Sequence, residues 1–182
     1  MTSAGSRRRR VLTSIGTLAT LALGTFCEAS ERADLAFQQL VRQVEHRQFT
    51  RATVLYLDPR SESIVSMTVP LFQEVACHIE LGSSSPRWTD LLAALKEEKP
   101  VAGEGGMGDI RLGIVFHGAK DQTQELYFAG YIGPQESDQL QVKGVVNDSP
   151  VRFSYAMPRK VRALIRGLPC LGTTHPYPLG LP

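Results

Sequence analysis

The chain has 182 residues and a formal net charge of +2 at pH 7, with 42% of its residues hydrophobic and 21% charged. These values are those of an ordinary globular protein and exclude collagen, coiled coil and whole-chain disorder. The length allows one domain with a leader, and the small net charge argues against a nucleic-acid partner. Three cysteines are too few for a disulfide scaffold.

The first 29 residues have the layout of an export signal. Four consecutive arginines at 7–10 precede an uncharged run from Val11 to Phe26. A short segment that ends in the small residue Ala29 follows and supplies the expected cleavage site. The run is shorter than the ~20 apolar residues of a membrane-spanning helix, which favours a cleaved signal peptide over an anchor. The arginines also suit the twin-arginine route, with general secretion as the alternative. We predict a bacterial periplasmic or secreted protein whose membrane contact is limited to this signal.

Cleavage after Ala29 changes both the charge and the cysteine count. The remaining 153 residues hold 16 basic and 17 acidic side chains, because four of the 20 basic and one of the 18 acidic residues leave with the signal. Lipidation of Cys27 is disfavoured because bulky Phe26 precedes it. In the mature chain, Cys77 and Cys170 are either joined by a disulfide or remain as two free thiols. A disulfide here closes a long loop and contributes about 4 kcal/mol in the chain-entropy model.

The segment from residue 30 to 82 alternates between two hydrophobic periods. Apolar residues first recur at helical spacing, and β-branched and aromatic residues then dominate, as in strands. The short connection between the first two strand patterns predicts a hairpin. The expected elements are a helix at 31–48, strands at 52–57 and 63–69 joined by a turn at 58–61, a helical turn at 71–75 and a strand at 76–81.

The best-defined predicted element is a helix that follows Ser85. Ser85 is a favoured N-cap residue, Pro86 suits the first helical position, and an apolar stripe runs from Trp88 to Leu95. The helix is expected to end before Pro100. The loop at 103–108 then has the spacing G-x-G-x-x-G. Dinucleotide-binding loops of this kind lie between a strand and a helix, whereas here a helix precedes and a strand follows. No nucleotide or other cofactor is therefore expected.

Short turns separate the remaining strand patterns, which predicts antiparallel neighbours. A last helix is expected from Pro158, with an apolar stripe ending at Leu168, and residues 171–182 form a loose tail after a single domain at 30–170. The predicted class is α+β, an antiparallel sheet of five to six strands with two to three helices packed on one face. The later strands are expected at 110–116, 125–131, 140–146 and 151–155.

Residue types that carry chemistry form no catalytic constellation in the sequence. His78 and Glu80 alternate on one strand and share a face, and His117 lies at a strand end four residues before Asp121. No two histidines have the i, i+4 spacing of a helical metal site, so no metal ligand is predicted. Cys77 and His78 are strand neighbours that face opposite ways, which prevents a thiolate–imidazole pair. No catalytic residue is predicted.

Two functions fit these observations. The first is a non-catalytic exported binding protein, an inhibitor or immunity-type protein that neutralises another protein such as a toxin or an enzyme. The second is a small secreted hydrolase that uses acidic residues and a histidine at strand ends. For the first function, contacts are expected from the loop at 103–108, the turns at 118–121 and 133–138, and the basic side of the last helix. The candidate partner-binding residues are Gly105, Met107, His117, Asp121, Arg159, Arg162 and Arg166.

Overall fold

The computed structural model of the chain describes residues 34–57, 67–103, 107–130 and 141–170. Several sequence predictions lie outside these residues. They are the signal peptide at 1–29, the turn at 58–61, most of the strand at 63–69, the turn at 133–138 and the tail at 171–182.

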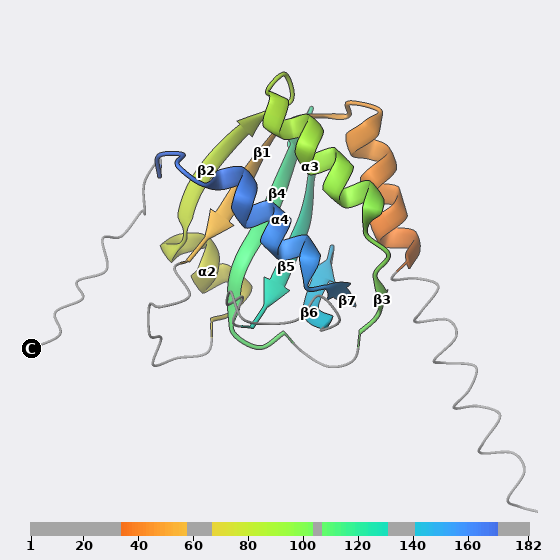
Figure 1. The fold of residues 1–182 in the computed structure, drawn as a ribbon, viewed down its shortest axis with the longest axis vertical. Helices are drawn as coiled ribbons and strands as arrows, with labels where there is room; N and C mark the ends of the chain where they lie inside the picture. Colours follow the sequence, from red (N-terminus) through yellow and green to blue (C-terminus); the bar gives the residue numbers. More distant parts are fainter. Residues whose placement is uncertain (1–33, 58–66, 104–106, 131–140, 171–182) are drawn as a thin grey trace, which may run out of the picture.

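An antiparallel sheet of seven strands forms the centre of the fold, so the predicted α+β class is confirmed. The strands are β1 (Phe49–Tyr56), β2 (Cys77–Gly82), β3 (Val101–Ala102), β4 (Ile110–Gly118), β5 (Thr123–Ala129), β6 (Gln141–Val146) and β7 (Ser149–Ser154). Their order across the sheet is β2-β1-β4-β5-β6-β7-β3 (Figure 1). The sheet exceeds the predicted five to six strands in part because β3, a two-residue strand, pairs with the outer side of β7.

Three helices cover one face of the sheet (Figure 1). They are the helix over residues 34–45, α3 (Pro86–Glu97) and α4 (Ala156–Ile165). The start of α3 is as predicted, because the Trp88 N–H donates to the Ser85 hydroxyl at 3.2 Å. The start of α4 lies two residues before Pro158, which occupies the first turn, where its missing N–H breaks no helical hydrogen bond.

A fourth helix, α2 (Val69–Val75), packs on the opposite face and includes the helical turn predicted at 71–75. Pro70 lies in its first turn, and Phe72 packs edge-on against Tyr127 with ring centroids 6.3 Å apart. The predicted hairpin of β1 with residues 63–69 is wrong. Both edges of β1 are occupied, one by β2 and the other by β4.

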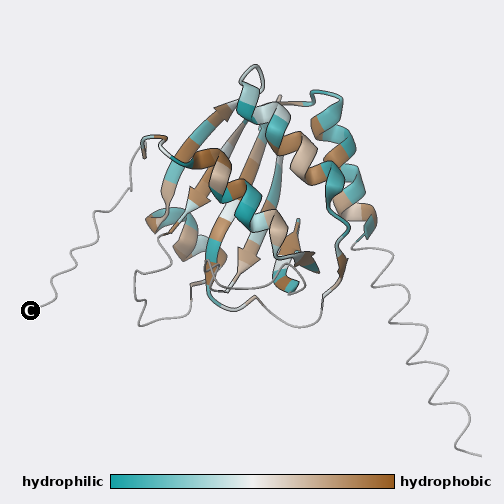
Figure 2. Ribbon diagram, in the orientation of Figure 1, coloured by the Kyte–Doolittle hydropathy of each residue, from teal (hydrophilic) through white to brown (hydrophobic). Residues whose placement is uncertain are grey.

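The main core lies between the sheet and the three helices. Alternation along β4 directs Leu112, Ile114 and Phe116 into this core, and all three are fully buried. Figure 2 shows hydrophobic segments in the strands beneath the helices and hydrophilic segments on the helices. The opposite side of the sheet, which we call the open face, has a smaller core in which α2 covers Leu55 and Tyr127.

Two tight turns position the strand ends. Asn147 and Asp148 join β6 to β7 with φ values of 45° and 67°, as a two-residue hairpin turn of this type requires. In the β4–β5 turn, Lys120 and Asp121 also have positive φ values, 54° and 59°. Because the β6–β7 turn is so short, β7 begins at Ser149, two residues before the predicted strand.

Candidate functional site

An open hollow of about 900 Å³ lies along one side of α4. Side chains between Ala156 and Leu168 form one wall, and Tyr56, Cys77 and Ile79 of β1 and β2 form the other wall and the floor. We call this hollow the α4 groove.

The wall of the groove is strongly basic. Arg159, Lys160, Arg162 and Arg166 line it, and none of the described residues that line it is acidic. Residues seven apart return to the same side of an α-helix, so Arg159 and Arg166 are aligned. Arg162 lies between them, about one helical turn from each. Lys160 forms an ion pair with Glu97 of α3. Three of the four basic side chains that line the groove are therefore arginines.

Tyr56 holds the central arginine in place. The Arg162 guanidinium lies 5.5 Å from the centroid of the Tyr56 ring, and its Nη2 donates to the phenol oxygen at 3.3 Å. Stacking of a guanidinium on an aromatic face is favourable and restricts its rotation. The pair joins the last residue of β1 to α4, 106 residues further along the chain.

A disulfide joins Cys77, which lines the groove, to Cys170. The two Cα atoms are 5.4 Å apart and the cysteines are 93 residues apart in sequence. Of the two alternatives that the sequence left open, the structure has the bridged one. Cys77 is paired with Tyr56 in the sheet register, so the bridge ties the segment after α4 to the groove floor.

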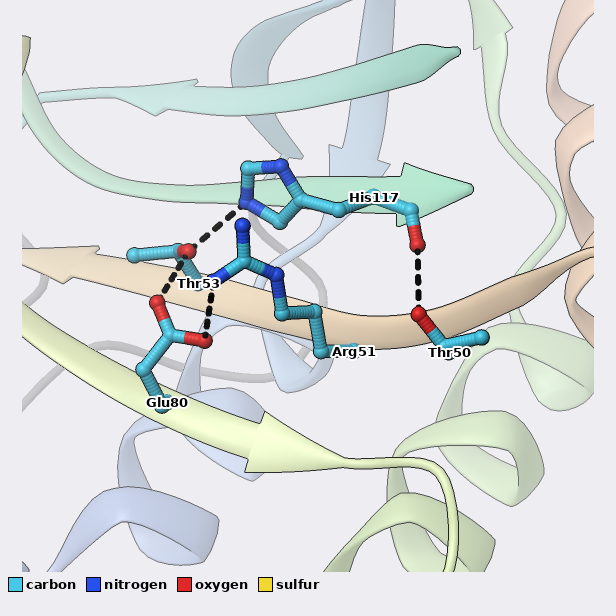
Figure 3. Close-up of polar contacts among 5 residues, drawn as sticks. All are labelled: Thr50, Arg51, Thr53, Glu80 and His117. Atoms are coloured by element: carbon cyan, nitrogen blue, oxygen red, sulfur yellow. Dashed lines mark hydrogen bonds and ion pairs between the residues drawn. The ribbon is translucent and has the colours of Figure 1, made fainter. Parts of the chain in front are cut away.

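A second polar cluster lies on the open face and joins three strands (Figure 3). The Thr53 hydroxyl donates to Glu80 Oε1 at 2.6 Å, and Arg51 forms an ion pair with the same carboxylate at 3.6 Å. The Thr53 oxygen also lies 2.8 Å from His117 Nε2. Because the hydroxyl has one proton, which it gives to Glu80, His117 must donate from Nε2. This network assigns the proton to Nε2 and leaves the lone pair on Nδ1.

The imidazole of His117 is kept neutral by its surroundings. Partial burial lowers the pKa of His117, and the positive charge of Arg51 lowers it further. The carboxylates of Glu80 and Glu125 act in the opposite direction and do not reverse the shift. At neutral pH the ring therefore carries one proton, in agreement with the hydrogen-bond network.

The polar residues singled out in the sequence converge only in part. Glu80 and His117 are joined through Thr53, but His78 turns toward α2 and donates from Nε2 to the Gln73 carbonyl at 2.8 Å. Asp121 is exposed in the β4–β5 turn. Among the residues that the structure describes, no group of three histidine, cysteine or acidic side chains is placed to hold a metal ion.

The candidate partner-binding residues do not share one surface. Arg159, Arg162 and Arg166 line the α4 groove, whereas Met107 packs against the small core on the open face. His117 lies on the open face and Asp121 in its exposed turn, and Gly105 lies outside the described residues. Sequence reasoning missed three contributors. They are Tyr56, Thr53 and Arg51, for which only their place in or beside the predicted strand at 52–57 gave a signal.

Comparisons of the chain with known protein families, with curated proteins and with solved structures found no match. Within the described part of the chain, no helix has both the length and the apolar character needed to cross a membrane.

Proposed function

We propose that this chain is an exported, non-catalytic binding protein that neutralises a partner protein, and that the partner binds in the α4 groove. One observation carries the proposal. Arg159 and Arg162 of α4 and Arg166, its C-cap residue, line a single open hollow with an apolar and aromatic floor, and no described acidic residue lines it. Arginine and tyrosine are enriched at the energetically dominant positions of protein interfaces.

The groove is better suited to a protein than to a lipid surface. A helix that lies on a membrane inserts a free apolar face into the lipid. The apolar side of α4 is not free, because Met157, Val161 and Ile165 are buried in the main core. A nucleic-acid partner is also disfavoured, since Tyr56 is the single aromatic residue among the described residues that line the groove, and Arg162 covers it.

The predicted leader and the disulfide support an exported location. Disulfides persist in oxidising compartments and are rare in the cytosol. The Cys77–Cys170 bridge also fixes the segment after α4 beside the groove floor. A wall fixed in this way loses less conformational entropy on binding than a mobile one, which favours tight association.

The test is co-purification of the partner with the full-length chain, expressed with its own leader and recovered from the periplasmic or culture fraction. A groove variant, Arg159→Glu with Arg166→Glu, is compared with a control variant, Arg42→Glu with Lys143→Glu. The control changes net charge equally at exposed positions on the 34–45 helix and on β6. Wild type and control should recover the same protein in a one-to-one complex, and the groove variant should not.

Equal recovery of that protein by the groove variant contradicts the proposed binding surface. Recovery of no specific protein from any fraction, together with turnover of a substrate, contradicts the binding function itself.

The open-face cluster supports a second candidate function, a small secreted hydrolase. His117 is neutral, is oriented through Thr53 toward Glu80 and has its Nδ1 lone pair available as a proton acceptor. Hydrolysis of ester and glycoside substrates by the purified chain tests this function. A general base contributes roughly 10²- to 10⁴-fold to a rate. Activity that survives His117→Ala, or no activity in wild type, excludes this candidate.

A further inference from the structure

The spacing of the three arginines in the α4 groove determines which spacing of negative charges on a partner would complement them. We infer that the groove binds an acidic α-helical segment of the partner, with carboxylates at positions i, i+3 or i+4, and i+7. The inference rests on the proposed function and names the chemical class of the partner segment.

The axial spacing favours a helix over an extended chain. At 1.5 Å per residue, Arg162 lies about 4.5 Å and Arg166 about 10.5 Å along α4 from Arg159. A second helix with carboxylates at i, i+3 and i+7 repeats these spacings. Side chains on one face of an extended chain recur about every 6.7 Å, so three successive carboxylates match at most one of the two intervals.

The chemistry of the wall favours carboxylates. A guanidinium binds a carboxylate through two parallel hydrogen bonds, which a single ammonium group cannot do. Arg162 is already oriented by Tyr56, so its side chain loses little rotational freedom when it binds. Lys160, which also lines the groove, forms an ion pair with Glu97 of α3.

The small residues of α4 leave room for a second helix. Ala163 lines the groove between Arg162 and Arg166, and Ala156 lines it one turn before Arg159. Short side chains at such positions allow two helices to approach closely. Ala163 and Leu168, which line the groove and are not buried, offer apolar surface to side chains that flank the acidic stripe. The expected segment is therefore amphipathic, with leucine or alanine beside its carboxylates.

The C-terminal residues of the chain do not supply this charge. Residues 171–182 contain no aspartate or glutamate. This segment, which follows the bridge at Cys170, therefore does not match the arginines, and we assign the acidic helix to a separate protein.

Two synthetic peptides of identical composition test the inference with the full-length chain. Each has about 20 residues of Glu, Ala, Leu and Gln, a length that supports partial helicity in isolation. In the stripe peptide the glutamates follow the i, i+3, i+7 pattern, and in the scattered peptide they are distributed around the helix. Wild type should bind the stripe peptide at least about tenfold more tightly in a fluorescence anisotropy titration.

Variants connect this binding to the groove. The groove variant, Arg159→Glu with Arg166→Glu, should lose the preference for the stripe peptide, and the control variant, Arg42→Glu with Lys143→Glu, should keep it. A stripe peptide with lysine in place of glutamate should bind the groove variant more tightly than wild type, provided that thermal melts show both proteins folded. This reciprocal result requires direct contact between the charged side chains of the peptide and positions 159 and 166, since a loss of folding would not produce it.

Three results overturn the inference. They are equal affinity for the two peptides, binding that the groove variant retains, and tighter binding to vesicles of anionic phospholipid than to the stripe peptide. The inference also fails separately from the proposed function. If the co-purified partner requires Arg159 and Arg166 but neither peptide binds, the groove is a partner surface for a segment of another shape.

Discussion

The Nε2–H of His117 donates to the hydroxyl oxygen of Thr53 at 2.8 Å, and this bond connects β4 to β1 across the open face. Thr53 is only 7% exposed, so its hydroxyl is almost entirely removed from water. The same oxygen carries the proton that Glu80 accepts from β2. One buried hydroxyl thus orders polar side chains from three neighbouring strands (Figure 3).

Replacement of Thr53 by valine should destabilise the protein by about 1 kcal/mol, because valine keeps the shape and removes the shared hydroxyl. Urea unfolding measures the loss. Thr50→Val is the matched control on the same strand, since Thr50 is exposed and its hydroxyl lies 3.5 Å from the His117 carbonyl oxygen. The control should change the free energy of unfolding by less than about 0.5 kcal/mol. Equal effects at the two positions contradict a special role for Thr53.

His117 should make the protein less stable as the pH falls below 6.5, the ordinary pKa of histidine. Burial and Arg51 lower the pKa of His117 in the folded state, so between 6.5 and that lower pKa the unfolded chain binds the proton first. The contribution of neutral His117 to the free energy of unfolding is therefore complete above pH 6.5 and is lost as the pH falls through the pKa of the folded state. The difference in unfolding free energy between wild type and His117→Gln, measured from pH 7.5 to 5, should show this loss.

Arg51→Met supplies an independent check on the cause of that shift. Removal of the positive charge should raise the pKa of His117, because Arg51 is the second cause of its lowering after burial. Proton NMR titration of the imidazole measures the change. An unchanged or lower pKa in this variant would mean that Arg51 does not act on the ring.

The sequence predicts correctly those features that depend on residues close together in the chain, such as the start of a helix. Ser85 and Pro86 marked the start of α3 because an N-cap acts within one turn. Helical spacing alone also predicts that Arg159 and Arg166 share one side of the last helix. The predicted hairpin failed for the opposite reason. The residue pattern of a strand does not specify which other strand pairs with it. In the structure, β1 pairs with β2 and β4 rather than with the segment that follows it.

The same limit applies to the candidate sites. Alternation placed His78 and Glu80 on one face, but the register of β1 decides which of them meets Thr53. Tyr56 reaches the groove through its contact with Arg162 on α4, 106 residues away in sequence. Such contacts depend on strand order and helix placement, which no local pattern in one sequence specifies.

Gly144→Ala should be strongly destabilising, by about 3 kcal/mol, because the strand has no space for a methyl group there. A Cβ at this position of β6 would overlap the Tyr127 carbonyl oxygen of β5 and lie 2.6 Å from the Phe153 ring. Gly82→Ala is the control, since a Cβ there meets no atom within 4 Å. Thermal melts should show a lower Tm for the first variant alone. Similar Tm values for both variants would contradict close packing around Gly144.

Loss of the disulfide should cost about 4 to 5 kcal/mol, since the bridge joins residues that are 93 apart and so removes much of the freedom of the unfolded chain. A Cys27→Ser background leaves Cys77 and Cys170 as the remaining cysteines. In urea unfolding, dithiothreitol should destabilise this protein and leave the Cys77→Ala, Cys170→Ala variant unaffected. Two reactive thiols in the unfolded, unreduced protein would exclude the bridge. If the bridge also fixes the α4 groove, the same variant should bind the acidic stripe peptide more weakly under conditions in which it remains folded.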